Sequence, residues 1–201
     1  GVEFSRTGGP GSTTSFFLRG QNSVNTVILI DGVRTQVDGG GSLTVTDFPL
    51  SMVERVEILR GNASALYGEA AIGGVINITT RHTKGTPQSN YSATLGSYGT
   101  RSVTAGYGGD VEDYNFDLNV GKTAVDGFSA INPSTYSSAN PDANGSQATF
   151  AGMRLEKRLT RDRLVGLRSS IKRQDTSYDS AYDLSTDGHS FKNQTDALGV
   201  S

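Results

Sequence analysis

The second part of the chain alternates between apolar and polar positions. From about residue 89 onward, apolar side chains stand at every second position, with polar residues or glycine between them; the clearest run is 114–121, YNFDLNVG. Because side chains of a strand point alternately to its two faces, each run predicts a strand with one apolar and one polar face. The expected strands are centred on 91–95, 103–107, 114–120, 151–155 and 165–171, with a weaker one at 192–201.

Two architectures produce this alternation. Strands of about ten residues are typical of outer-membrane barrels, whose apolar face meets lipid and whose polar face lines the lumen. A soluble antiparallel sheet with one solvated face gives the same pattern. The connections favour the barrel. In an up-and-down meander, the long connections 123–145 and 175–190 share one end with the short connection 96–101, and the short ones at 108–113 and 159–162 share the other. Long external loops and short periplasmic turns are arranged in this way.

The first part of the chain has a mixed pattern. The β-branched run 27–30 predicts a strand, and Asp31-Gly32 after it predicts a hairpin turn. Residues 52–59 predict a short helix passing into a strand, residues 64–68 a helical turn, and residues 75–80 another strand. The expected fold is therefore an α+β domain over residues 1–84, followed over residues 85–201 by about six antiparallel strands of a transmembrane β-barrel.

Composition excludes several classes of function. The chain has no cysteine, two histidines far apart (His82 and His189) and a formal charge of −2. These counts exclude disulfides and thiolate sites, and they argue against a histidine-built metal site and a nucleic-acid-binding surface. No Ser/His/Asp arrangement is visible, so we expect no enzyme. A hydrophobic content of 34%, against about 45–50% in ordinary globular domains, fits strands with only one apolar face.

Several sequence blocks between residues 17 and 81 resemble one family. The stretches are 17–20 (FLRG), 27–34 (VILIDGVR), 53–61 (VERVEILRG), 65–68 (ALYG) and 72–78 (IGGVINI). In order and spacing they resemble the plug domain of TonB-dependent outer-membrane transporters. Within the family, the resemblance is closest to the cobalamin (vitamin B12) transporters, through 47–49 (DFP), the short stretch 94–102 and two acidic loops.

The resemblance implies a location, partners and a mechanism. A plug would lie inside a barrel of about 22 strands in the outer membrane of a Gram-negative bacterium, in contact with outer-membrane lipid. Ligand would bind at the external face, and TonB, with its inner-membrane energising complex, would drive import after engaging a TonB box that precedes residue 1. Because six strands cannot close a barrel, we expect the sequence to be a fragment of such a transporter.

The polar turns of the plug are the candidates for ligand contact, because glycine and small polar residues let the backbone approach a bulky ligand. The residues expected to contact ligand are Gln21, Asn22, Ser23, Asn25, Thr35, Gln36, Val37 and Tyr67. The same glycines also suit tight turns without any ligand.

The two long connections are acidic and contain no lysine or arginine. Their oxygen ligands suit a hard metal ion such as calcium. The resemblance implies calcium-ordered loops, with these residues at matching positions: Asp126, Asp142, Asn144, Tyr178, Asp179 and Asp187. Asn144 stands where an acid is expected. Aspartates are also common turn formers in solvated loops.

Three functions follow from these observations. The first is active import of cobalamin, with a ferric siderophore as the alternative ligand of the same family. The second is a passive pore or surface adhesin, which explains the alternation and leaves the plug blocks without a role. The third, an enzyme on a barrel scaffold, lacks candidate catalytic residues.

Overall fold

The computed structural model describes residues 2–6, 8–9, 11–12, 14–21, 25–34, 52–61, 64–68, 71–132, 134–136, 142–160, 163–179 and 189–200. The chain divides into two compact units. The first comprises Gly1–Thr7 and Thr13–Arg81, and the second comprises Gly8–Ser12 and His82–Ser201. No helix among the described residues is long and apolar enough to cross a membrane.

The first unit is a small α+β domain with two sheets. Strands β1 (Val2–Arg6) and β2 (Thr14–Leu18) pair with each other. The larger sheet has the order β4-β3-β6-β5, and its members are β3 (Thr26–Ile30), β4 (Val33–Arg34), β5 (Val53–Arg60) and β6 (Gly74–Thr80). A single helical turn, α1 (Ser64–Tyr67), lies between β5 and β6 in sequence. The expected strands at 27–30 and 75–80 and the helical turn at 64–68 are confirmed.

Strand β3 forms the centre of this unit. It pairs in parallel with β6, and alternate β3 side chains enter two clusters of buried residues. Val27 packs with Ala71 and Val75 in one cluster, while Ile28 packs with Ile76 in the other. A strand that is buried on both faces needs an unbroken apolar run, which is why residues 27–30 lack alternation.

The expected hairpin at Asp31-Gly32 is confirmed. Both residues have positive φ angles, 49° and 79°, as in the type I′ turn that matches the twist of paired strands. The Asp31 carboxylate also accepts a hydrogen bond of 2.8 Å from the Thr80 backbone N–H and another of 2.5 Å from the Thr80 hydroxyl. The aspartate therefore ties the β3–β4 turn to the end of β6.

The expected short helix within residues 52–59 is wrong. Residues 53–60 form the strand β5, which pairs antiparallel with β6 from Val53↔Thr80 to Arg60↔Gly74. The spacing of apolar residues suited a helix as well as a strand. Pairing with β6 decided the outcome, because an extended β5 satisfies the backbone groups along that side of β6.

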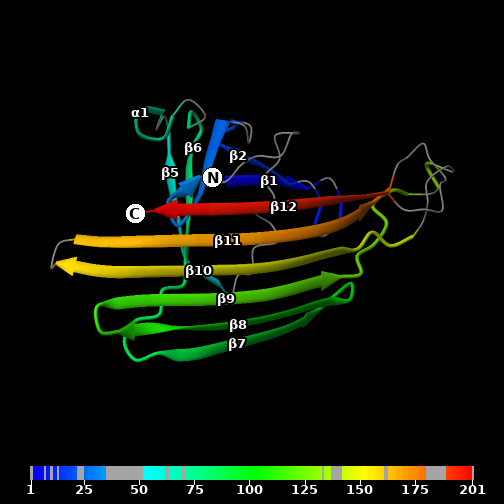
Figure 1. Ribbon diagram of the computed structural model, residues 1–201. Coiled ribbons are helices and arrows are strands. Elements are labelled where there is room, and N and C mark those ends of the chain that lie inside the picture. Colours follow the sequence, from blue (N-terminus) through cyan, green and yellow to red (C-terminus); the bar gives the residue numbers. More distant parts are fainter. Residues whose placement is uncertain are drawn as a thin grey trace. The chain divides into compact units, whose positions relative to one another are not determined.

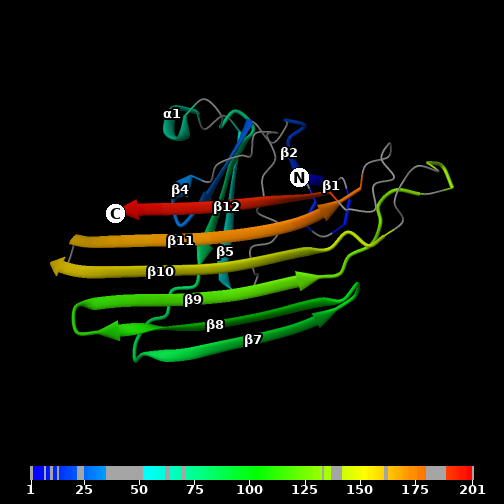
Figure 2. The ribbon, with the colours of Figure 1, turned by 45° about the vertical axis from the view of Figure 1, so that its right-hand side comes forward.

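The second unit contains one antiparallel sheet of six strands in sequence order, which Figure 1 and Figure 2 show side by side. The strands are β7 (Gln88–Gly96), β8 (Thr100–Val111), β9 (Tyr114–Val125), β10 (Ser146–Thr160), β11 (Arg163–Tyr178) and β12 (His189–Val200). All six strands expected from the alternation are confirmed, including the weak one near the end. Their lengths, 9 to 16 residues, reach or exceed the roughly 9–11 residues that a tilted strand needs to cross a bilayer.

The connections also follow the expected arrangement. The long connections 126–145 and 179–188 share one end of the sheet with the close turn at 97–99. The short connections 112–113 and 161–162 lie at the opposite end. We refer below to the first as the long-connection end and to the second as the short-turn end.

Candidate functional site

One face of the six-stranded sheet carries apolar side chains in the open. The register places Tyr91, Val103, Val120 and Met153 on the same face. Their exposed fractions are 79%, 58%, 54% and 41%. Soluble monomers rarely expose a contiguous apolar surface of this kind, whereas a lipid-facing barrel wall requires one. We call this surface the apolar face.

Polar groups bound the apolar face at both ends. At the short-turn end, the Lys157 ammonium lies 5.0 Å from the centre of the Tyr114 ring, and the rings of Tyr107 and Phe116 are 5.5 Å apart. At the long-connection end, Arg101 forms a 2.6 Å ion pair with Asp126. Aromatic residues and cations concentrate where a membrane protein meets the water interface.

The opposite face of the sheet is polar and contains a buried ion pair. Arg154 donates a 2.8 Å hydrogen bond to Asp117, and both side chains are almost fully buried. The second carboxylate oxygen of Asp117 accepts a 3.0 Å bond from the Thr83 backbone N–H, and the Asn115 amide donates to the Thr83 carbonyl at 2.8 Å. The segment that leads into β7 is thus fastened to β9 by side chains of its polar face.

A cluster of polar side chains joins the two long connections. The Asp179 carboxylate accepts a 2.8 Å hydrogen bond from the Ser129 hydroxyl and a 2.6 Å bond from the Asn144 amide. Asn144 is buried, with 8% of its surface exposed. Two of the residues expected at a calcium site, Asn144 and Asp179, are therefore brought together, although 35 positions separate them in sequence.

The other expected calcium ligands have different surroundings. Asp126 is paired with Arg101. Asp142 is exposed, as is Tyr178. Asp187 lies outside the described residues. Ser129 was not expected in the cluster, because a lone serine in a polar loop carries no signal in sequence.

The donor set fits calcium in part. Calcium takes six to eight oxygen ligands, and a carboxylate, a hydroxyl and a side-chain amide meet at Asp179. Within the described ranges, no three acidic, histidine or cysteine side chains lie close enough to hold a metal ion. An ion at Asp179 would thus need further oxygens from the remainder of the two connections.

The expected ligand contacts in the first unit form a smaller group. The Asn25 amide donates a 3.1 Å hydrogen bond to the Gln21 side chain. Gln21 closes a tight turn in which it exchanges backbone hydrogen bonds of 3.0 and 3.1 Å with Leu18. Tyr67, in α1, is 39% exposed. Asn22, Ser23, Thr35, Gln36 and Val37 lie outside the described residues.

Comparison with a family model identifies the first part of the chain. Residues 1–75 match the TonB-dependent Receptor Plug Domain. The first part of this chain is therefore similar to the plug domain of TonB-dependent receptors. The match covers the blocks from 17–20 to 65–68 and the first four residues of the block 72–78.

Solved receptors share the fold of both parts. The siderophore receptor PirA from Acinetobacter baumannii is 23% identical with a TM-score of 0.71, over 89% of this chain and 28% of that one. The ferric yersiniabactin uptake receptor FyuA from Yersinia pestis is 19% identical with a TM-score of 0.69, over 100% and 37%. FpvA from Pseudomonas aeruginosa, bound to a heterologous pyoverdine, is 15% identical with a TM-score of 0.75, over 98% and 27%.

These comparisons confirm the expected fold, a plug domain followed by barrel strands. The chain spans less than two fifths of the length of these solved receptors.

Proposed function

We propose that the chain is part of a receptor that imports a scarce, bulky ligand across the bacterial outer membrane, with TonB supplying the energy. The plug-family match over residues 1–75 carries this proposal. A passive pore or an adhesin would keep the apolar face, but it has no use for a plug. Import leaves the bonds of the ligand intact, so we expect no catalytic residues.

The first candidate ligand is cobalamin. Support comes from the acidic long connections and from the cluster around Asp179, which joins them. The alternative ligand is a ferric siderophore. Its support is that PirA is described as a siderophore receptor and FyuA as a ferric yersiniabactin uptake receptor, and both share this fold.

Calcium is the second part of the proposal. An ion bound at Asp179 would order the two loops before ligand arrives. Its further oxygen ligands would come from Asp126, Asp142, Asn144, Tyr178 and Asp187. Ordering in advance reduces the entropy lost on binding and raises affinity. The residues of this chain would hold the ion and present the loops, and the ion would supply positive charge to the carboxylates that hold it.

Binding of cyanocobalamin to the full-length receptor, with and without a calcium chelator, tests both parts. We expect binding that weakens roughly tenfold or more when calcium is removed, since tenfold corresponds to a modest change in free energy. Asp179→Asn should reproduce the effect of the chelator, while Asp113→Asn, in the short turn at the other end of the sheet, serves as the matched control.

The outcomes separate the alternatives. Cobalamin binding that ignores the chelator would eliminate calcium and leave the ligand assignment intact. Absence of cobalamin binding, together with tight binding of a ferric siderophore, would replace the ligand and keep the transporter. Failure to bind either class of ligand would count against uptake of these compounds altogether.

A further inference from the structure

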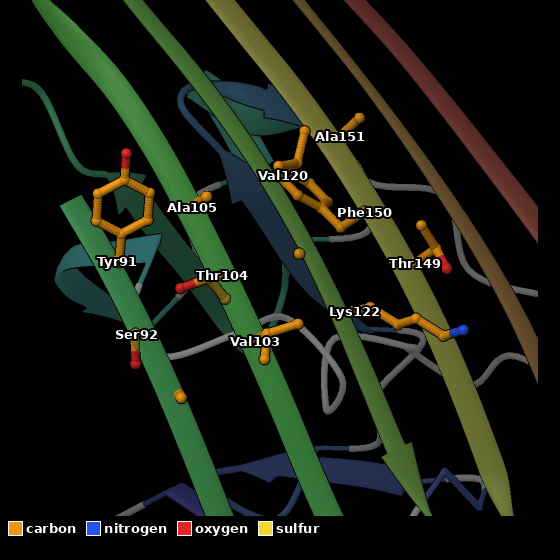
Figure 3. A pocket seen from close by; sticks show the side chains of 12 residues that line it. Tyr91, Ser92, Val103, Thr104, Ala105, Val120, Lys122, Thr149, Phe150 and Ala151 are labelled. Atoms are coloured by element: carbon orange, nitrogen blue, oxygen red, sulfur yellow. The ribbon is translucent and has the colours of Figure 1, made fainter. Parts of the chain in front are cut away.

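The apolar face carries a hollow. A shallow, open hollow of about 660 Å³ lies over strands β7 to β10, and Figure 3 shows the side chains that line it. Register places Ala105, Val120 and Ala151 in one row across three adjacent strands. Tyr91 stands opposite Ala105 and is 79% exposed. Small side chains beside a projecting aromatic ring account for the hollow.

A polar row borders this hollow toward the long-connection end. Thr149 pairs in register with Lys122 on β9 and with Arg173 on β11. All three residues belong to the apolar face, and all three are exposed. Lys122 and Thr149 also line the cavity itself. Two cations therefore flank a hydroxyl, with their backbones roughly 10 Å apart because neighbouring strands are about 4.8 Å apart.

The position of this row excludes a structural role in the lumen. The polar face, which would line the lumen, is occupied by groups such as Asp117 and Arg154. Lys122 and Arg173 stand on the other side, where a long basic side chain reaches the level of lipid headgroups at the edge of the apolar band. Arg101, which lies nearby on the same face, already has Asp126 as its partner.

We propose that Lys122, Thr149 and Arg173 bind the phosphorylated headgroup of a membrane lipid with several acyl chains, and that the hollow lined by Ala105 and Ala151 receives its chains. Two observations support this occupant. The paired cations are complementary to phosphate, with a hydroxyl between them as an additional donor, and an apolar hollow of this size borders them directly. The proposal depends on the lipid-facing barrel wall and is independent of which ligand the receptor imports.

Native mass spectrometry of the full-length receptor in detergent, titrated with lipid A, tests the proposal. Lys122→Gln combined with Arg173→Gln should weaken lipid A binding roughly tenfold or more, because two charge-assisted contacts are lost. Lys122→Arg combined with Arg173→Lys keeps both charges and should retain binding. Dephosphorylated lipid A, which has the same acyl chains, should bind the wild type as weakly as lipid A binds the double glutamine variant.

A second variant tests the hollow. Ala151→Phe should lower affinity for lipid A by filling the cavity while leaving the cations in place. Lys157→Gln is the matched control, because Lys157 is a basic residue of the same face at the short-turn end, and it should leave binding unchanged. Heat-modifiable mobility on gels verifies that each variant is folded.

Three results would overturn the proposal. The first is equal lipid A binding by the wild type and the double glutamine variant. The second is an equal loss in Lys157→Gln, which would indicate general attraction of basic residues to lipid. The third is full displacement of lipid A by millimolar inorganic phosphate, which would indicate a site for the free anion.

Discussion

At the scale of single residues, the most consequential contact is the buried pair between Asp117 and Arg154. The two side chains are 6% and 7% exposed, and the contact measures 2.8 Å. Asp117 also accepts a hydrogen bond from the Thr83 backbone N–H. One carboxylate therefore stabilises both the sheet and the segment that precedes it. A charge buried in this way is stable only while its partners remain.

We predict that Asp117→Ala lowers the free energy of unfolding of the full-length barrel by about 3–5 kcal/mol, since the buried charge of Arg154 loses its carboxylate partner. Urea titration of the refolded protein in lipid vesicles measures the change. Arg101→Ala breaks an exposed pair and should cost no more than about 1 kcal/mol. Replacing both Asp117 and Arg154 by apolar residues should recover part of the loss. Equal effects of the two single variants would show that burial of the Asp117 pair contributes nothing.

At the scale of elements, β9 shows how one strand serves two environments. Leu118 is 50% exposed and belongs to the apolar face, while its neighbour Asn119 belongs to the polar face. Leu118 stands four residues from Tyr114 and four from Lys122, which places it roughly 14 Å from each boundary along the strand. The middle of the bilayer is where a charge on the lipid side costs most.

Leu118→Arg should therefore destabilise insertion by about 2–4 kcal/mol, the cost of a cation near the bilayer midplane on the lipid face. Asn119→Arg, one residue away, should change little because its side chain enters the polar lumen. The fraction of folded barrel after refolding into vesicles, read from heat-modifiable gel mobility, compares the two. A larger loss for Asn119→Arg would reverse the assignment of the faces.

At the scale of the whole molecule, the chain combines two units with different construction. The first unit has its own buried clusters around β3 and β6. The second is a single sheet whose buried residues include Asp117, Arg154, Gln174 and Thr176, so polar contacts replace a hydrophobic core there. This division matches the plug and wall that the TonB-dependent receptor family implies.

The proposed function predicts that, in the full-length protein, uptake and binding separate. Deleting TonB, or collapsing the proton gradient, should abolish accumulation of labelled ligand inside cells, because the plug then receives no energy. Binding of the same ligand to the cell surface should persist at wild-type affinity. Uptake that continues without TonB would identify a passive pore.

The sequence by itself determined the sheet and its two faces. Period-two alternation is a local property of each strand, so all six strands from β7 to β12 and their order of long and short connections could be predicted without coordinates. The Asp31-Gly32 hairpin was predictable for the same reason, since its positive φ angles depend on the residues of the turn. The plug blocks pointed to the family because their order and spacing are specific.

Only the tertiary structure decided how residues distant in sequence meet. Residues 53–60 became a strand because β6 supplied a partner. Asn144 and Ser129 both met Asp179. Lys122 aligned with Thr149 and Arg173 because sheet register is set by pairing over long separations. Local spacing cannot specify such contacts, since a shift of one residue would turn every side chain of a strand to the opposite face.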